Sequence, residues 1–360
     1  MNPADNENEV WTVKRMLEWM RGYLERKGDE NPRVSSEWLL SEACDLRRID
    51  LYLNPDRPLD AAERDVLRGF VARRGAGEPL QYITGEAPFR YLTVKVRPGV
   101  LIPRPETEVL VSEALSCLPA AGRRQAAWSA ESSRQEAAAV AELKERLAAA
   151  QEGGAAAGAA AEAGVADAAG AGAAGAGAAA GDRPEDAAAP LLVADICTGS
   201  GCIACAIASE RPDARVIAVD VAPEAVALAR ENAAALGLAD SVKVLQGDLG
   251  APVPERYLGR FDLVVSNPPY VPTAVLADMP REVAEFEPAL ALDGGADGLD
   301  LFRRLVPWAA SALKPGGGFA CELHETCLDD AAAIAQAVGF SDVRVVRDLA
   351  ERPRVLVCRR

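Results

Sequence analysis

The chain has 360 residues, of which 49% are hydrophobic, so it is long enough for two domains with a sizeable core. Its formal net charge of -15 argues against broad, sequence-independent nucleic-acid binding, which depends on a basic surface. Because no apolar run is long enough to span a bilayer and the polar, acidic N-terminus is unlike a signal peptide, we expect a cytoplasmic protein with no membrane partner and no stable nucleic-acid partner.

Residues 1–80 are predicted to form a small helical domain. Over residues 8–27, five apolar residues are spaced three or four apart: Val10, Val13, Leu17, Met20 and Leu24. Residues 38–43 suggest a second helix, and Asp60 followed by Glu63 resembles a capping box that opens a third. The expected buried face of this third helix consists of Val66, Leu67, Phe70 and Val71. This domain contains no catalytic pattern, so we expect it to bind a partner or cover a site.

A linker with a β-hairpin is predicted for residues 81–105. Leu92, Val94 and Val96 alternate with polar residues, and Pro98-Gly99 is expected to turn the chain. The stretch PRPETE then leads into an apolar, periodic helix at about residues 106–118.

Residues 120–189 have a different composition. Every residue from 153 to 181 is Ala or Gly except Glu162, Val165 and Asp167. Such a tract has little to bury and cannot offset its own ordering entropy. We therefore expect a low-complexity, mostly mobile insertion within the second domain.

From Leu191 onward, strands and helices alternate. This order predicts an α/β fold with a doubly wound, mostly parallel sheet, as part of a second domain at residues 106–360. The last two strands are separated by a short turn and are expected to form an antiparallel pair at one edge. Cys202 and Cys205 form a C-x-x-C, but the chain has a single histidine and no second such pair, so we expect packed small residues and no metal site.

The first loop of this second domain runs from Asp195 to Ala204 and connects a strand to a helix. Its glycines allow a ligand to approach the backbone closely. Asp220 ends the next strand, at the distance where an acid binds ribose hydroxyls. The letters GSGCIA also satisfy the dinucleotide fingerprint, so the loop alone leaves NAD and S-adenosyl-L-methionine as alternatives.

Two acidic positions, together with the proline-rich corner described in the next paragraph, favour S-adenosylmethionine over NAD. A carboxylate at Asp195 would repel a pyrophosphate but suits the ammonium and sulfonium charges of this cofactor. After the third strand, Asp248 could accept from the adenine amine while Leu249 packs on the adenine face. Ligands of open α/β sheets lie beyond the carboxyl ends of the strands, where all these residues are expected.

The corner NPPY follows the fourth strand and suits methylation of a planar NH₂ group. The Asn267 side-chain oxygen and the Pro268 carbonyl can each accept one N–H of such a group, which turns its nitrogen toward a methyl donor. Pro268 and Pro269 add no competing donors, and Tyr270 can stack on the flat face of the substrate. Catalysis would then depend on positioning and electrostatics, with no strong base.

These motifs resemble a known family. DICTGSG, GDL and SNPPYV resemble S-adenosylmethionine-dependent amino-methyltransferases, and EPLQYITGEAPF, PRPETE and DLAERPRVLVCRR are similar to the N5-glutamine methyltransferases that modify release factors. The resemblance implies that the substrate is the glutamine of the Gly-Gly-Gln tip of class-1 peptide-chain release factors, and that the N-terminal helical domain helps to bind that partner. It also implies roles for the motif residues: Cys197, Thr198, Gly199, Ser200, Gly201, Asp220 and Leu249 would line the cofactor, and Asn267, Pro268, Pro269 and Tyr270 would hold the glutamine. Members of the family often have an aromatic residue at the position of Leu249.

Two alternatives remain at this point. An adenine-N6 or guanine-N2 nucleic-acid methyltransferase would also present an NH₂ to NPPY, although the net charge and the lack of a basic domain count against it. A cofactor-binding interaction protein would have no need of the acceptor pair. Arg104 and Glu106 of PRPETE are expected to form a structural ion pair that fixes the interdomain loop, with substrate or cofactor contact as the second interpretation.

Overall fold

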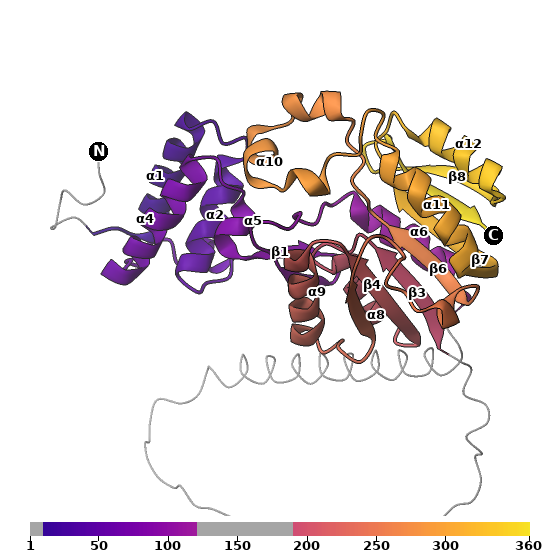
Figure 1. Cartoon of the computed structure of the whole chain (residues 1–360). Coiled ribbons are helices and arrows are strands. Elements are labelled where there is room, and N and C mark those ends of the chain that lie inside the picture. Colours follow the sequence, from indigo (N-terminus) through magenta and orange to yellow (C-terminus); the bar gives the residue numbers. More distant parts are fainter. Residues whose placement is uncertain (1–9, 121–189) are drawn as a thin grey trace, which may run out of the picture. The chain divides into compact units, whose positions relative to one another are not determined.

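The computed structural model describes residues 10–120 and 190–360 of the chain (Figure 1). The predicted Ala/Gly-rich insertion lies outside the described residues from position 121 to position 189. Residues 10–118 and 190–360 form one compact unit, which contains both the helical region and the sheet.

Five helices form the N-terminal region: α1 (Val13–Arg26), α2 (Pro32–Ala43), α3 (Asp50–Leu53), α4 (Ala61–Gly75) and α5 (Leu80–Thr84). Helix α1 begins after Thr12, whose hydroxyl accepts a hydrogen bond from the Arg15 N–H at 3.4 Å. The expected inclusion of Val10 was wrong, because Val10 precedes this cap and is 66% exposed. Met16, one turn before Met20, takes a buried position instead.

The predicted capping box of α4 is confirmed. Asp60 accepts from the Glu63 N–H at 2.8 Å, and the Glu63 side chain accepts from the Asp60 N–H at 2.9 Å. Leu67 and Val71 form the buried part of the helix face, whereas Val66 is 45% exposed and does not belong to it. The apolar stripe of α4 is therefore narrower than the sequence pattern suggested.

The hairpin consists of β1 (Glu86–Phe89) and β2 (Leu92–Lys95), which pair antiparallel. Phe89 pairs with Leu92, so the chain turns at Arg90 and Tyr91, with Arg90 at a φ of 53°. The expected turn at Pro98-Gly99 is present, with the Val100 N–H donating to the Arg97 carbonyl at 3.3 Å, but it follows the second strand and is not the turn of the hairpin. Helix α6 (Thr107–Cys117) begins within PRPETE.

A seven-stranded sheet forms the centre of the second region, in the order β5-β4-β3-β6-β7-β9-β8. Its strands are β3 (Leu191–Ile196), β4 (Ala214–Asp220), β5 (Val242–Gln246), β6 (Phe261–Ser266), β7 (Leu313–Glu322), β8 (Ser341–Arg347) and β9 (Pro353–Arg359). The five neighbouring strands β5, β4, β3, β6 and β7 pair parallel, which confirms the predicted doubly wound fold. The antiparallel pairing of β8 with β9 is also confirmed, and β9 lies between β7 and β8.

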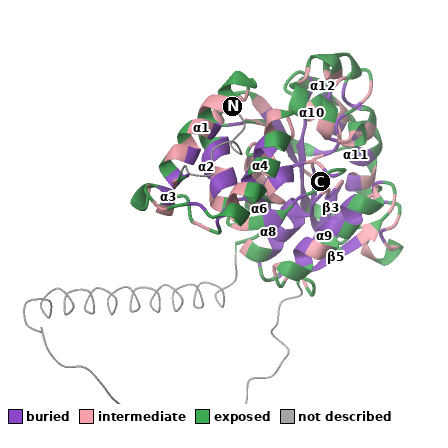
Figure 2. Cartoon of the chain, turned by 90° about the vertical axis from the view of Figure 1, so that its left-hand side faces the viewer, coloured by how far each residue is buried: buried purple, intermediate pink, exposed green. Residues whose placement is uncertain are grey.

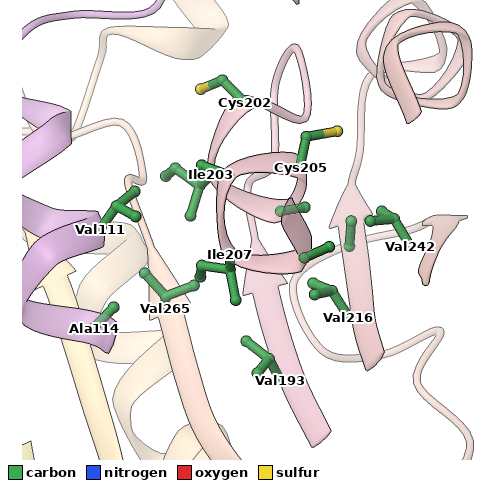
Figure 3. Close-up of a cluster of buried hydrophobic side chains, with 14 of the residues drawn as sticks. Val111, Ala114, Val193, Cys202, Ile203, Cys205, Ile207, Val216, Val242 and Val265 are labelled. Carbon is green, nitrogen blue, oxygen red and sulfur yellow. The ribbon is translucent and has the colours of Figure 1, made fainter. Parts of the chain in front are cut away.

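Helices cover both faces of this sheet. They are α8 (Cys202–Glu210), α9 (Pro223–Ala235), α11 (Asp300–Ala312) and α12 (Leu328–Val338). Side chains alternate between the faces: Val193 and Val265 pack with α6, α8 and α9, whereas Ala194 and Val264 pack with α11 and α12. Figure 3 shows Ile207 of α8 close to Val193, Val265 and the α6 side chains. Figure 2 shows the buried residues gathered in the strands and along the inner sides of the helices.

Cys202 and Cys205 lie at the start of α8, as expected for packed small residues. Both are free and buried, and burial raises the pKa of each thiol to about 12. Across residues 10–120 and 190–360, no group of three or more His, Cys, Asp or Glu side chains is arranged to hold a metal ion. In the same residues, no helix has both the length and the apolar character that a bilayer crossing needs.

Short elements connect the sheet to its helices: η2 (Glu255–Tyr257), η3 (Thr273–Asp278), α10 (Arg281–Phe286) and η4 (Ala289–Ala291). The last three follow the NPPY corner in the chain, and α10 contacts the helical region (Figure 1). Arg74 at the end of α4 donates to Asp29 at 2.7 Å and to Glu282 of α10 at 2.9 Å. The pair with Asp29 is shielded from water, whereas Glu282, which makes the contact between the two regions, is about half exposed.

Candidate functional site

The glycine loop after β3 has three residues in the left-handed backbone region: Cys197 (φ 63°), Gly199 (φ 55°) and Gly201 (φ 79°). A Cβ on Gly201 would lie 3.0 Å from the Ala229 Cβ, so this glycine allows α9 to pack against the loop. A Cβ on Gly199 would meet nothing within 4 Å. The open side of the loop is therefore at Gly199, where a ligand can approach the backbone.

Asp195 lies beneath this loop and is 0% exposed. Its Oδ2 accepts from the Thr198 hydroxyl at 2.6 Å and from the Ala204 N–H at 3.1 Å, which ties both ends of the loop together. Its Oδ1 is buried and accepts no hydrogen bond among the described residues. Burial raises the pKa of this carboxyl to about 7, so a cation nearby would stabilise its ionised form.

Asp220 at the end of β4 is oriented by backbone donors. Its Oδ2 accepts from the Gly199 N–H at 2.8 Å and its Oδ1 accepts from the Ala222 N–H at 3.0 Å. Each carboxylate oxygen has a second lone pair, so the group can still accept from a diol. Burial raises the pKa of Asp220.

These loops surround a cavity of about 350 Å³ at the carboxyl ends of the strands. The predicted site residues that line it are Cys197, Gly199, Asp220, Asp248, Leu249, Asn267 and Pro269. Six other predicted residues are not in its lining. Asp195, Thr198, Ser200 and Gly201 are buried at the glycine loop, Pro268 is buried at the NPPY corner, and Tyr270 lines a second cavity. The lining is mostly apolar with a few carboxylates at its edge, a composition that suits a nucleoside with a cationic group.

Asp248 and Leu249 lie in the loop that follows β5. Asp248 forms an ion pair with Arg304 of α11, and both side chains are about half exposed. Leu249 has a φ of 48° and is 9% exposed, with its side chain at the cavity wall. Sequence analysis did not identify Arg304, whose guanidinium is a second candidate contact at this end of the cavity.

The NPPY corner follows β6 directly. The Asn267 Nδ2 donates to the Thr107 hydroxyl at 3.1 Å. Neither the Asn267 Oδ1 nor the Pro268 carbonyl accepts a hydrogen bond from any described residue. Two acceptors are therefore left open on consecutive residues. Asn267 lines the cavity that the glycine loop also lines, whereas Pro268 is buried and is not part of that lining.

A second cavity of about 200 Å³ adjoins the first. Leu101, Asn267 and Ala291 line both, so Asn267 lies where the two cavities meet. The second cavity is also lined by Tyr270, Arg104, His324 and Arg354. Its basic groups are distant from one another in the chain, and sequence analysis found only Arg104 among them.

Tyr270 is held from behind by a buried carboxyl. Its hydroxyl donates to the Glu322 Oε1 at 2.9 Å, and Glu322 at the end of β7 is 1% exposed. Burial raises the pKa of Glu322, while the nearby hydroxyls of Thr107 and Tyr270 act in the opposite direction. Burial also raises the pKa of Tyr270, so the phenol remains protonated at neutral pH.

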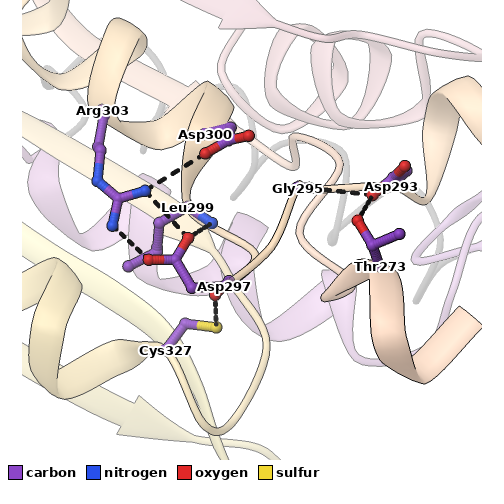
Figure 4. A network of polar contacts seen from close by, with 8 residues as sticks. All are labelled: Thr273, Asp293, Gly295, Asp297, Leu299, Asp300, Arg303 and Cys327. Atoms are coloured by element: carbon purple, nitrogen blue, oxygen red, sulfur yellow. Dashed lines mark hydrogen bonds and ion pairs between the residues drawn. The ribbon is translucent and has the colours of Figure 1, made fainter.

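The loop at residues 293–299 packs backbone against backbone on Tyr270. A Cβ on Gly294 would lie 2.7 Å from the Tyr270 Cα, and one on Gly298 would lie 2.4 Å from the Tyr270 carbonyl oxygen. Figure 4 shows the polar contacts that hold this loop. The Asp297 carboxylate accepts hydrogen bonds from the Arg303 guanidinium and from the Leu299 N–H. Only glycine fits at these two positions, and they fix where Tyr270 lies.

Arg104 of the PRPETE segment has a different ion-pair partner from the one expected. Arg104 pairs with Glu287 at 2.5 Å, so the expected structural ion pair exists but its partner is not Glu106. Burial raises the pKa of Glu287 to about 6, although Arg104 lowers it. Glu287 lies just after α10, and the pair therefore joins this segment to the wall of both cavities.

Asn232 is a supporting residue that sequence analysis missed. It is 1% exposed in α9, where its Oδ1 accepts from the Lys95 N–H at 2.8 Å. Its Nδ2 donates to the Lys95 carbonyl at 3.0 Å and to the Ser200 carbonyl at 2.8 Å. One buried amide thus links the hairpin to the glycine loop. The only available signal was a polar residue inside an otherwise apolar helix face.

Known proteins are similar in sequence to both regions of the chain. Residues 15–85 match the family described as PrmC N-terminal domain, and residues 186–280 match the family described as Methyltransferase small domain. The chain is 38% identical over 340 residues to the release factor glutamine methyltransferase of Geobacter sulfurreducens, with 94% of each chain covered. It is 36% identical over 334 residues to that of Moorella thermoacetica, covering 92% of this chain and 93% of the relative. The relative from Rhodopirellula baltica is 32% identical over 356 residues, with 98% of each chain covered.

Proposed function

The chain belongs to the release factor glutamine methyltransferase family, and from that membership we propose its substrate and cofactor. It methylates the side-chain amide nitrogen, N5, of the glutamine in the Gly-Gly-Gln motif of a class-1 peptide-chain release factor, in the cytoplasm. Methyltransferases of this family use S-adenosyl-L-methionine, which supplies a methyl group on a positively charged sulfur. The remaining chemistry is carried by the protein's own residues.

One observation carries this proposal: the NPPY corner has two open acceptors on consecutive residues, and the first of these residues, Asn267, lies at the meeting point of two cavities. A glutamine amide has two N–H groups and a nitrogen whose lone pair is delocalised. Acceptance of one N–H by the Asn267 Oδ1 and the other by the Pro268 carbonyl would fix the amide plane. Such preorganised acceptors also stabilise the positive charge that develops on the nitrogen.

The larger cavity suits the cofactor. Asp220 has the free lone pairs to hold the ribose, and Leu249 offers an apolar surface for the adenine. Asp195 has one buried oxygen without a partner, and this residual negative charge beneath the loop favours a cationic ligand nearby. Asp248 would hold the adenine amine by exchanging its contact with Arg304.

The smaller cavity suits the glutamine side chain. Tyr270 offers a ring fixed by Glu322, and the flat amide can lie against it. Arg104, His324 and Arg354 surround this cavity and favour a substrate surface with acceptor groups. The catalytic residues in this proposal are Asn267, Pro268 and Tyr270.

We assign the domains in the same way. Residues 1–80 are the helical release-factor-binding domain, 81–105 the hairpin linker, and 106–360 the methyltransferase domain. The ion pair of Arg74 with Glu282 joins the helical domain to α10, which follows the NPPY corner in the chain. A release factor held by the helices would thus lie beside the smaller cavity. The nucleic-acid methyltransferase alternative is not favoured, given the net charge of -15 and the names of the relatives.

Mass spectrometry of the product tests the proposal directly. The full chain is incubated with S-adenosylmethionine and either a class-1 release factor or DNA. The expected result is one added methyl group on the Gly-Gly-Gln glutamine and none on DNA. A release factor whose tip glutamine is replaced by asparagine serves as the matched control and should gain no methyl group. Methylation of DNA, or of a different release-factor residue, would overturn the proposal.

A further inference from the structure

The side chain of Asn267 is anchored by a residue outside the NPPY motif. Its Nδ2 donates to the Thr107 Oγ1 at 3.1 Å, and this is the sole hydrogen bond of its carboxamide among the described residues. Thr107 is 2% exposed and opens α6, directly after the proline-rich turn of PRPETE. The two residues are 160 positions apart in the chain, so their contact depends on the tertiary fold.

The direction of an asparagine amide is a choice between two orientations. Its terminal torsion is broad and roughly two-fold, so oxygen and nitrogen exchange places on rotation by about 180°. With the oxygen toward the smaller cavity, the group accepts from a substrate NH₂. With the nitrogen there, two donors would face each other and the substrate amide would be rejected. The residue needs a partner that selects the first orientation.

A hydroxyl can select it only if its own proton points elsewhere. Thr107 can in principle accept from Nδ2 or donate to Oδ1. A buried oxygen is available for that proton: the Oε2 of Glu322 is buried and has no partner in the described residues, while its Oε1 receives the Tyr270 hydroxyl at 2.9 Å. Burial raises the pKa of Glu322, and the nearby Thr107 hydroxyl acts to lower it.

We propose that Thr107 is a positioning residue that sets the orientation of the Asn267 carboxamide. The polarity of the contact runs from the Asn267 NH₂ to the Thr107 oxygen. The Asn267 oxygen is thereby left facing the substrate. This inference rests on the proposed function, because it concerns how the glutamine amide is held.

Single-turnover kinetics with the release factor test the role of Thr107. Thr107→Val removes the hydroxyl at nearly constant volume and should lower kcat roughly tenfold, the equivalent of one lost neutral hydrogen bond. The affinity for S-adenosylmethionine, measured by calorimetry, should stay unchanged. Thr107→Ser keeps the hydroxyl and should restore most of the rate. Thermal unfolding of all variants identifies any loss that comes from misfolding.

A double-mutant cycle separates positioning from a general structural effect. In an Asn267→Ala background, Thr107→Val should cause no further loss, because Thr107 acts through Asn267. Additive losses, or a Thr107→Val enzyme with wild-type turnover, would overturn the inference. Failure of the wild-type protein to methylate the glutamine would instead contradict the proposed function.

Discussion

Glu37 in the helical region and the NPPY corner at the sheet edge differ in how their oxygen atoms are paired. Glu37 of α2 is 3% exposed, and its two oxygens receive hydrogen bonds from Arg33, Arg48 and Tyr52. At the sheet edge, the Asn267 Oδ1 and the Pro268 carbonyl have no donor among the described residues, and one oxygen of Asp195 is buried without a partner. Buried polar groups are normally paired within the protein. The Glu37 carboxylate is therefore satisfied by the fold itself, whereas the corner leaves acceptors for a ligand.

Asn267→Ala removes the open acceptor and should have the largest effect of the changes considered below. Loss of one preorganised polar contact costs on the order of a hundredfold or more in turnover. Cofactor affinity should be largely retained, because the glycine loop and Asp220 are untouched. Single-turnover rates and calorimetry measure the two quantities. Asn31→Ala, at an exposed asparagine whose side chain forms no cap, is the control and should leave turnover unchanged. A variant at position 267 with near-wild-type turnover would contradict the role of the corner.

Glu37 should make the helical region sensitive to acid. Burial raises the pKa of Glu37, but the hydrogen bonds of its three partners lower it to about 2, from 4.5 in a free side chain. Because the folded pKa lies below the unfolded one, the stabilisation is complete above pH 4.5 and is lost as the pH falls toward 2. The contribution is on the order of 3 kcal/mol at neutral pH. Urea unfolding of wild type and Glu37→Gln should show a difference that shrinks over this range.

Glu42 provides the matched control on the same helix. Its pKa is raised by burial and by repulsion from Glu86 and Asp45. Ionised Glu42 therefore disfavours the fold at neutral pH, and Glu42→Gln should leave stability equal or slightly higher. If both glutamine variants lost stability equally, the pairing of Glu37 would not be the cause.

The sequence predicted the parts of the molecule that repeat a local pattern. The capping box at Asp60 and the alternation that builds the parallel sheet follow from short-range chemistry, and the structure has both. The same patterns failed at Val10 and Val66, where apolar spacing continues past the point at which the chain leaves the core. Periodicity shows which residues share a face but not where that face ends.

The supporting residues of the site could not be predicted in this way. Thr107 contacts Asn267 across 160 positions, and Asn232 contacts Lys95 across 137. Each is an ordinary helix residue whose role depends on tertiary packing. Sequence analysis placed the glycine loop, Asp220 and NPPY at one edge because strand ends are a local feature. It assigned Asp195 to the cofactor, whereas in the structure this carboxyl also ties the loop together.

Gly294→Ala tests how tightly the corner is supported. The new Cβ would lie 2.7 Å from the Cα and the carbonyl carbon of Tyr270, so backbone must move. Overpacking of this kind costs about 1–3 kcal/mol of stability. Turnover should fall as well, because Tyr270 and its contact to Glu322 shift together. Thermal unfolding and single-turnover rates check the two effects, and a variant that keeps both values would show that the loop does not set the position of Tyr270.

Gly69→Ala is the same substitution in the helical region, and its effect on stability should have the opposite sign to that of Gly294→Ala. Gly69 lies inside α4 on the exposed side, and a Cβ there would meet nothing within 4 Å. Alanine reduces the freedom of the unfolded chain and has the higher helix propensity, so stability should rise by about 0.5–1 kcal/mol. Turnover should not change, since α4 contacts the sheet region through Arg74 and not through this face. A loss of stability measured by urea unfolding would mean that the exposed face of α4 is packed against something in solution.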